Sequence, residues 1–153
     1  MKIHTYRARV HWAPLDGEGT KSYRSYSRDH TIGAEGKPAI EASSDPAFRG
    51  NPQRYNPEEL LIASLTSCHM LWYLHLCAVN GITVVEYRDD AFGVMEENAD
   101  GFGQFVEAEL RPSVRLAENA DRSKALALHE EAHRRCFIAA SVNFRVSVNA
   151  EVL

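Results

Sequence analysis

The sequence predicts an α+β protein in which largely antiparallel sheets pack around one long central helix. Three observations support this fold class. Strand-like and helix-like segments follow one another in the order βββ-α-ββ-α-β. Residues 60–79 carry no charged side chain, which is typical of a buried helix. A chain of 153 residues can also bury a substantial core without metals or disulfides, so we expect one domain over residues 1–153.

The N-terminal third is expected to form a small antiparallel meander. Residues 6–12 alternate bulky and polar side chains, which is typical of a strand with one buried face. Residues 21–32 are predicted to be a second strand, and residues 38–42 a third. The segment 43–55 contains two prolines and a glycine and is expected to be a loop.

The strongest predicted element is a helix over residues 57–79. Asn56 is a good N-cap, Pro57 suits the first helical position, and Glu59 stands where a capping box places its carboxylate. An Asn-Gly pair after residue 79 provides the stop. The uncharged run is long enough to span a membrane, but polar side chains interrupt it, so a core helix is favoured. One small chain can hardly cover every face of this helix, and we therefore expect a homodimer.

The C-terminal half is expected to add a hairpin, a second helix and a last strand. Residues 81–95 and 105–116 are predicted to be its two strands, joined by a turn at 98–101. Residues 121–137 are predicted to be helical. The apolar stripe of this helix consists of Ala125, Leu128, Ala132 and Cys136. Residues 142–152 show the clearest strand alternation in the chain.

The charge balance argues against several kinds of partner. The chain has 17 Lys and Arg and 21 Asp and Glu, for a net charge of −4, and no basic run is present. Nucleic acid is therefore not expected as a partner. The first twelve residues lack the apolar run of a signal peptide, so we expect a cytoplasmic protein that does not associate with membranes.

Three cysteines, Cys68, Cys77 and Cys136, are the first candidates for chemistry. A structural disulfide is disfavoured in a reducing compartment, and no CxxC motif indicates a zinc or thioredoxin-type site. Cys77 follows Cys68 by nine residues on one helix, about 13 Å, whereas a disulfide needs a Cα separation of roughly 4.4–6.8 Å. The intrachain pairs left open are Cys68–Cys136 and Cys77–Cys136. The neighbours of Cys77 are apolar, which is typical of a core position.

Two stretches of the chain resemble a known family. Asn-Pro-Glu-Glu-Leu at 56–60 and Ala-Ser-Leu-Thr-Ser-Cys at 63–68 resemble the first-cysteine helix of the OsmC/Ohr family of organic hydroperoxide reductases. Cys136, in His-Arg-Arg-Cys-Phe-Ile at 133–138, stands where that family has its second cysteine. The resemblance covers essentially the whole chain. Ser-Leu-Thr-Ser before Cys68 departs from the best-known family pattern, which bears on substrate preference.

The resemblance implies an OsmC-like fold, an intertwined homodimer and a metal-free thiol peroxidase without a bound cofactor. Cys68 would be the peroxidatic cysteine that becomes a sulfenic acid, and Cys136 would resolve it to a disulfide. Arg28 would stabilise the thiolate and the peroxide, and Glu58 would orient the arginine through a charged pair. An external dithiol, often a lipoyl group in the family, would then reduce the disulfide.

The candidate active-site arginine and the candidate pocket residues lie mostly in one short stretch of the chain. Residues 26–30, Tyr-Ser-Arg-Asp-His, resemble the stretch that supplies the family's active-site arginine, here Arg28. Arg28 would share a basic face of the predicted second strand with His30, and a cation opposite the cysteine helix would favour the thiolate. Arg49 and Arg54 in the following loop are alternatives. The candidate pocket residues are Tyr26, His30 and Trp72.

The spacing of Glu58 and Cys68 also has a geometric consequence. Ten residues along one helix span about 15 Å, too far for one arginine to contact both side chains comfortably. If the cluster is kept, either Glu58 comes from the partner chain or the helix breaks between the two residues.

Two other functions are weighed against the peroxidase. The first is a non-catalytic OsmC-like protein that binds a small molecule or a thiol. The second is a zinc hydrolase, because His129-Glu-Glu-Ala-His133 matches the HExxH motif. This second function is remote, since no further ligand motif follows, and we expect both histidines on the helix surface. His69 is about 100° around the helix from Cys68 and is expected to be a packed or interface histidine rather than a general base.

Overall fold

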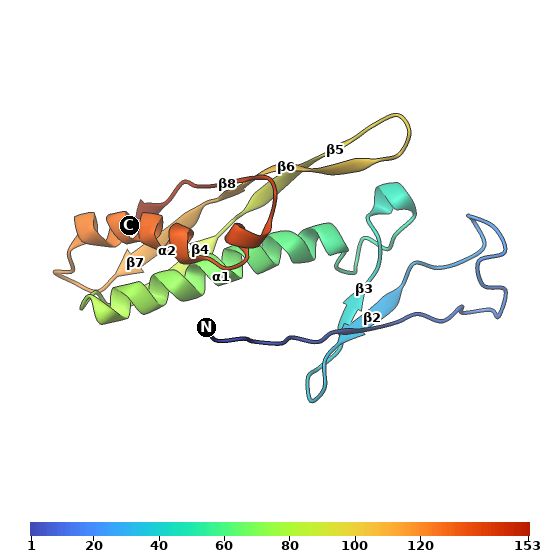
Figure 1. The fold of residues 1–153 in the computed structure, drawn as a ribbon, viewed down its shortest axis with the longest axis horizontal. Helices are drawn as coiled ribbons and strands as arrows, with labels where there is room; N and C mark the ends of the chain where they lie inside the picture. Colours follow the sequence, from blue (N-terminus) through green and yellow to red (C-terminus); the bar gives the residue numbers. More distant parts are fainter. The chain divides into compact units, whose positions relative to one another are not determined.

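The computed structural model describes residues 1–153 as two compact units, Met1–Leu60 and Leu61–Leu153. The first unit contains an antiparallel sheet in the order β1-β2-β3, of which Figure 1 labels β2 and β3. Its strands are β1 (Arg9–His11), β2 (His30–Gly33) and β3 (Ile40–Ala42). Ile32 pairs with Val10 on one side and with Ile40 on the other. This sheet is the predicted meander, although its strands are shorter than predicted.

The prediction of a strand over residues 21–32 is wrong for residues 21–29, of which 21–26 form turns and bends and 27–29 have no regular secondary structure. The Ser25 hydroxyl accepts the N–H of Ser22 and donates to the carbonyl of Gly19. Such local bonds from serine side chains compete with strand pairing. Arg28 therefore does not lie on a strand face, and the predicted basic face that it shares with His30 is absent.

Helix α1 (Pro57–Val79) begins and ends where the sequence predicts. The Asn56 carboxamide oxygen accepts the N–H of Glu59 at 2.8 Å, and the Asn56 amide donates to the Glu59 carboxylate at 3.2 Å. At the other end, the N–H of Ile82 donates to the carbonyl of Cys77 at 2.9 Å. Gly81 adopts φ +71° there, as a left-handed helix stop requires. The helix is unbroken between Glu58 and Cys68.

The predicted hairpin is present, but both of its strands bend in the middle. The first divides into β4 (Val84–Asp89) and β5 (Phe92–Glu97), and the second into β6 (Gly103–Leu110) and β7 (Pro112–Leu116). β4 pairs with β7 in one three-stranded sheet, and β5 pairs with β6 in another. At the bend, the Asp89 carboxylate accepts the N–H of Arg111 at 2.7 Å, and Pro112 has no N–H to donate.

The second helix and the last strand complete the second unit. Helix α2 (Arg122–Arg135) starts after Asp121, whose carboxylate accepts the N–H of Lys124 at 2.9 Å. The predicted last strand divides into β8 (Arg145–Val148) and β9 (Glu151–Val152). β8 pairs with β6 and β9 pairs with β7, and both pairings are parallel. The prediction of largely antiparallel sheets is confirmed, and the last strand is the parallel exception.

The core of the second unit forms where α1 packs against both of its sheets (Figure 1). Tyr73 of α1 belongs to a cluster with β7 and α2, and Leu65 belongs to a second cluster with β6. Only one stripe of α1 is buried in the chain, since Leu71 is 61% exposed. By length and composition α1 could cross a membrane, a property that it shares with the core helices of globular proteins.

Candidate functional site

Helix α1 and the end of α2 bring Cys68 and Cys136 next to each other. Cys68 lies near the middle of α1 and is partly exposed, whereas Cys136 follows the last residue of α2 and is buried. Burial raises the pKa of the Cys136 thiol to about 11. The N–H of Ala139, 3.4 Å from the Cys136 sulfur, partly offsets this effect, and the adjacent Cys68 side chain raises the pKa further. The two thiols therefore differ in exposure, and Cys136 is the buried one.

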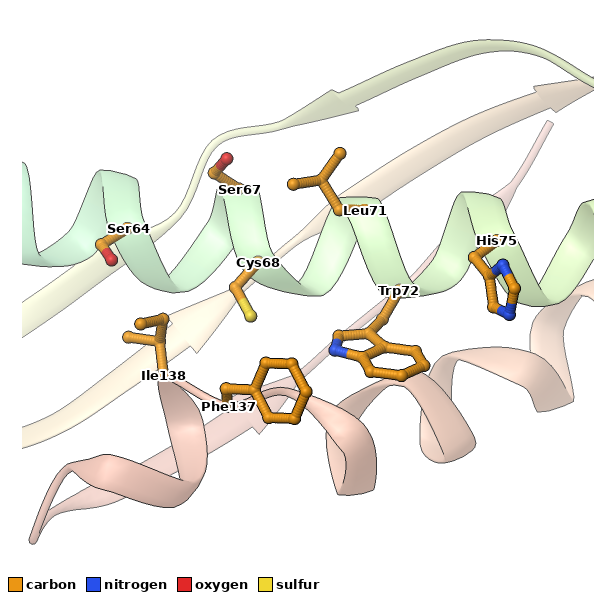
Figure 2. A pocket seen from close by; sticks show the side chains of 8 residues that line it. All are labelled: Ser64, Ser67, Cys68, Leu71, Trp72, His75, Phe137 and Ile138. Carbon is orange, nitrogen blue, oxygen red and sulfur yellow. The ribbon is translucent and has the colours of Figure 1, made fainter. Parts of the chain in front are cut away.

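Cys68 opens on a pocket of about 520 Å³ in the second unit. The pocket is lined by Ser64, Ser67, Cys68, Leu71, Trp72 and His75 of α1, and by Phe137 and Ile138 after α2. Figure 2 shows the Cys68 sulfur directed toward Phe137 and Ile138. A molecule bound in this pocket would meet the Cys68 sulfur beside apolar side chains.

Aromatic side chains form one wall of this pocket. The rings of Trp72 and Phe137 meet edge to face, with centroids 5.5 Å apart. The guanidinium carbon of Arg135 lies 5.7 Å from the centroid of Trp72, which places a cation beside this wall. An apolar wall of this kind favours organic ligands over small inorganic ones. Trp72, predicted as a pocket residue, therefore lines the pocket that holds Cys68.

Cys77 takes no part in this pocket. It is buried in the core of the second unit, and burial raises the pKa of its thiol. The neighbour of Cys136 is Cys68, so of the two pairings left open by the sequence the structure brings together Cys68 and Cys136.

Arg28 is held within the first unit by two tyrosines. Its two terminal nitrogens donate to the carbonyls of Tyr26 at 2.5 Å and Tyr23 at 2.6 Å. Its guanidinium carbon also lies 3.8 Å from the ring centroid of Tyr26 and 4.8 Å from that of Tyr23. These partners carry no net charge, so the positive charge of Arg28 remains uncompensated. His30 joins this group, because its Nδ1 lies 2.8 Å from the carbonyl oxygen of Arg28.

The alternative arginines have different surroundings. Arg54 forms ion pairs with Asp29 at 3.4 Å and with Glu41 at 3.8 Å, so acidic side chains compensate its charge. Arg49 forms no ion pair, and its guanidinium carbon lies 5.8 Å from the Tyr23 ring centroid. Electrostatics therefore favours Arg28 and Arg49 over Arg54 as a cation that is free to meet an anion.

Glu58 is half-buried near the start of α1, and one of its carboxylate oxygens is buried without a hydrogen-bond partner. No hydrogen bond or ion pair joins Glu58 to Arg28 in the chain. An unpartnered buried carboxylate oxygen is costly to stability.

The prediction that both HExxH histidines lie on the helix surface is wrong for His129, which is 3% exposed. Its Nδ1 lies 3.1 Å from Nε2 of His69, and its ring stacks on Tyr73 with centroids 3.8 Å apart. Burial lowers the pKa of His69 to about 4 and that of His129 to about 3. The available sequence signal was the position of His129 between Ala125 and Ala132 on the apolar stripe.

The side chains around His129 do not supply a set of metal ligands. Nδ1 of His129 faces His69 in the core, and no group of three or more His, Cys, Asp or Glu side chains in residues 1–153 is arranged to hold a metal ion. The HExxH spacing on α2 therefore does not produce a zinc ligand set.

The chain is similar to proteins of one known family. The family described as OsmC-like protein matches residues 50–151. The structure of VCA0330 from Vibrio cholerae O1 biovar eltor, an OsmC-like protein of unknown function, is 32% identical with a TM-score of 0.88, over 97% of this chain and 100% of that one. The organic hydroperoxide resistance protein OsmC from Legionella pneumophila is 16% identical with a TM-score of 0.70, over 99% and 98% of the two chains.

OhrB of Bacillus subtilis, an organic hydroperoxide resistance protein, is 19% identical with a TM-score of 0.62, over 97% and 98% of the two chains. At such identities the two resistance proteins share the fold with this chain. No curated protein matches the sequence significantly.

Proposed function

Because the chain belongs to the OsmC-like family, we propose that it is a cysteine-based peroxidase that reduces organic hydroperoxides to alcohols. One observation carries this proposal: a partly exposed cysteine at an apolar pocket lies next to a second, buried cysteine. The two structural neighbours named organic hydroperoxide resistance proteins support a redox role for this fold.

The proposed reaction begins at Cys68. Its thiolate attacks the distal oxygen of R–O–O–H, so that an S–O bond forms and the O–O bond breaks. The sulfur loses two electrons, which the peroxide gains, and the alkoxide takes up a proton and leaves as the alcohol. Cys68 is then a sulfenic acid.

Cys136 completes the proposed oxidation. Its sulfur attacks the sulfenic sulfur of Cys68, an S–S bond forms, and the hydroxyl group leaves with the thiol proton as water. An external dithiol, for which a lipoyl group is the family's example, then reduces the disulfide and is itself oxidised. The difference between the thiols supports this assignment, because the raised pKa and burial of Cys136 suit the second step and the exposure of Cys68 suits the first.

Titration with one equivalent of tert-butyl hydroperoxide should give a single new disulfide, Cys68–Cys136, because these two thiols are neighbours. Peptide mapping by mass spectrometry under non-reducing conditions would detect it. Cys77→Ala should give the same product at the same rate and is the matched control. A bridge that contains Cys77 would overturn the assignment of the cysteines. If all three cysteines stay reduced, the alternative of a non-catalytic protein that binds small molecules or thiols would be favoured.

We assign Arg28 to the stabilisation of the Cys68 thiolate and of the bound peroxide, because its charge is uncompensated and two tyrosines fix its guanidinium. In this proposal Glu58 orients the arginine from the partner chain. The unbroken helix α1 supports that choice, since it removes the alternative of a break between Glu58 and Cys68. The exposed stripe of α1 supports a homodimer in which each helix covers the other. We place this homodimer in the cytoplasm.

Arg28→Ala should slow the oxidation of Cys68 by about tenfold to a hundredfold, since a hydrogen bond to a charged group contributes roughly 1.5–3 kcal/mol. Stopped-flow measurement of the second-order rate constant with an alkyl hydroperoxide would test this. Arg54→Ala, which removes an arginine already paired with acids, is the control and should have little effect. If Arg49→Ala slows the reaction and Arg28→Ala does not, the role belongs to Arg49.

A further inference from the structure

We propose that the buried pair His69–His129 is a positioning element, which holds α1 and α2 in the one arrangement where Cys68 and Cys136 can form a disulfide. The proposal rests on the proposed function, because it concerns the second step of that reaction. Neither histidine touches the substrate or the reacting sulfurs in this proposal.

Each histidine lies on the helix that carries or precedes one of the two cysteines. His69 directly follows Cys68 on α1, and His129 precedes Cys136 by seven residues, about two turns of α2. Nε2 of His69 and Nδ1 of His129 are 3.1 Å apart, and the two ring planes differ by only 8°. This is the only side-chain hydrogen bond that joins α1 to α2 in the chain.

The remaining contacts between the two helices are far less directional. Tyr73, Cys77, Ala125 and Ala132 meet in the core through apolar surfaces, which tolerate small sliding movements. A hydrogen bond requires a narrow range of distance and angle, so it selects one relative position of the helices. The stacking of Tyr73 on the His129 ring further restricts the rotation of that ring.

Stability alone does not explain this pair. Nδ1 of His69 and Nε2 of His129 are buried without partners, so each ring satisfies only one of its two nitrogens. A half-satisfied polar pair in a core is commonly no more stable than apolar side chains of similar volume. Buried polar pairs of this kind are best known for fixing the register of helices.

The register matters for one of the two chemical steps. Oxidation of Cys68 requires the thiolate, the pocket and the peroxide. Phe137 and Ile138, which follow α2, line one side of this pocket, and small shifts of an apolar wall leave the bound peroxide within reach of Cys68. Disulfide formation has strict limits on distance and dihedral angle. Loss of the pair should therefore slow disulfide formation and leave the first step nearly unchanged.

The test compares the two steps in the variant H69L/H129L, which replaces both rings by apolar side chains and removes both unpartnered imidazole nitrogens from the core. Rapid quenching after mixing with tert-butyl hydroperoxide, followed by mass spectrometry, measures sulfenic acid and disulfide separately. We expect sulfenic acid to form within about twofold of the wild-type rate and the disulfide to form at least about tenfold more slowly. Excess peroxide should then drive Cys68 to sulfinic acid in the variant.

Two further variants separate positioning from general stability. His69→Gln provides an amide that can form a hydrogen bond with His129, so this variant should keep most of the wild-type rate of disulfide formation. Leu76→Ala removes buried apolar contacts of α1 without touching the pair, so it should lower the stability and leave the disulfide rate unchanged. If H69L/H129L fails to fold, His69→Asn, whose amide is too short to reach His129, takes its place with the same expected result.

A measurement without peroxide keeps the inference separate from the proposed function. The equilibrium between the dithiol and the Cys68–Cys136 disulfide in lipoamide buffers should shift toward the dithiol by about tenfold in H69L/H129L. A wild-type disulfide equilibrium in that variant, or an equal slowing by Leu76→Ala, would overturn the positioning role. If peroxide gives neither sulfenic acid nor a disulfide in the wild-type protein, the proposed peroxidase is overturned instead.

Discussion

Cys68→Ser should abolish peroxide reduction, with a loss of at least about a thousandfold, because a serine hydroxyl is a far weaker nucleophile than a thiolate at neutral pH. Consumption of an alkyl hydroperoxide in the presence of dihydrolipoamide measures this loss. Cys136→Ser should retain the first oxidation but give no disulfide, so Cys68 accumulates as sulfenic acid and more oxidised products. Cys77→Ala is the control and should keep the activity. Substantial turnover by Cys68→Ser would contradict the assignment of the nucleophile.

Cys68→Ser, combined with Glu58→Gln, also tests the shared site of the proposed homodimer. If Glu58 of one chain serves Cys68 of the other, Glu58→Gln should also be inactive. Mixing the two inactive variants should then restore one functional site per heterodimer. Two inactive variants that exchange subunits, as native mass spectrometry would show, and still regain no activity would contradict the shared site.

Acidification should destabilise the reduced protein strongly between pH 6.5 and about pH 3. In the folded protein burial lowers the pKa of His69 to about 4 and that of His129 to about 3. In the unfolded chain both titrate near 6.5, so below this pH the unfolded state binds protons that the folded state does not. The pair leaves stability unaffected above pH 6.5, lowers it as the pH falls, and adds no further loss below the folded-state pKa values.

The expected size of this effect is about 2 kcal/mol for each histidine between pH 7 and pH 5. Urea denaturation at the two pH values measures it as a change in the free energy of unfolding. In H69L/H129L the loss should shrink to the part that other groups contribute. An equal loss in that variant and in the wild-type protein would contradict the role of the pair.

The fold was predictable where signals are local. The α+β, OsmC-like fold is confirmed, and α1 has its predicted bounds because Asn56, Glu59 and Gly81 act within one turn of its ends. The bends in the hairpin were not predictable, because the bond between the Asp89 carboxylate and the N–H of Arg111 joins residues 22 positions apart. The parallel pairing of the last strand is likewise a tertiary property.

The candidate site divides in the same way. The family motif drew attention to Cys68 and Cys136, but only the packing of α2 against α1 places the two thiols side by side. The surroundings of Arg28 depend on carbonyls in turns that were predicted as a strand. The burial of His129 was predictable from Ala125 and Ala132, which lie on the same stripe of α2 and are buried. The HExxH pattern pointed instead to metal chemistry on the helix surface.

The burial of Cys136 has a consequence for the reductant. A thiol entering through the pocket meets the sulfur of Cys68, so Cys136 is the leaving group of that exchange. With a pKa of about 11, Cys136 is a poor leaving group and a strong nucleophile once deprotonated, and it readily re-forms the original bond. Cys136 would therefore expel a monothiol such as glutathione again and restore the protein disulfide. A slender dithiol carries a second sulfur, which attacks its own mixed disulfide and releases Cys68 before Cys136 can return.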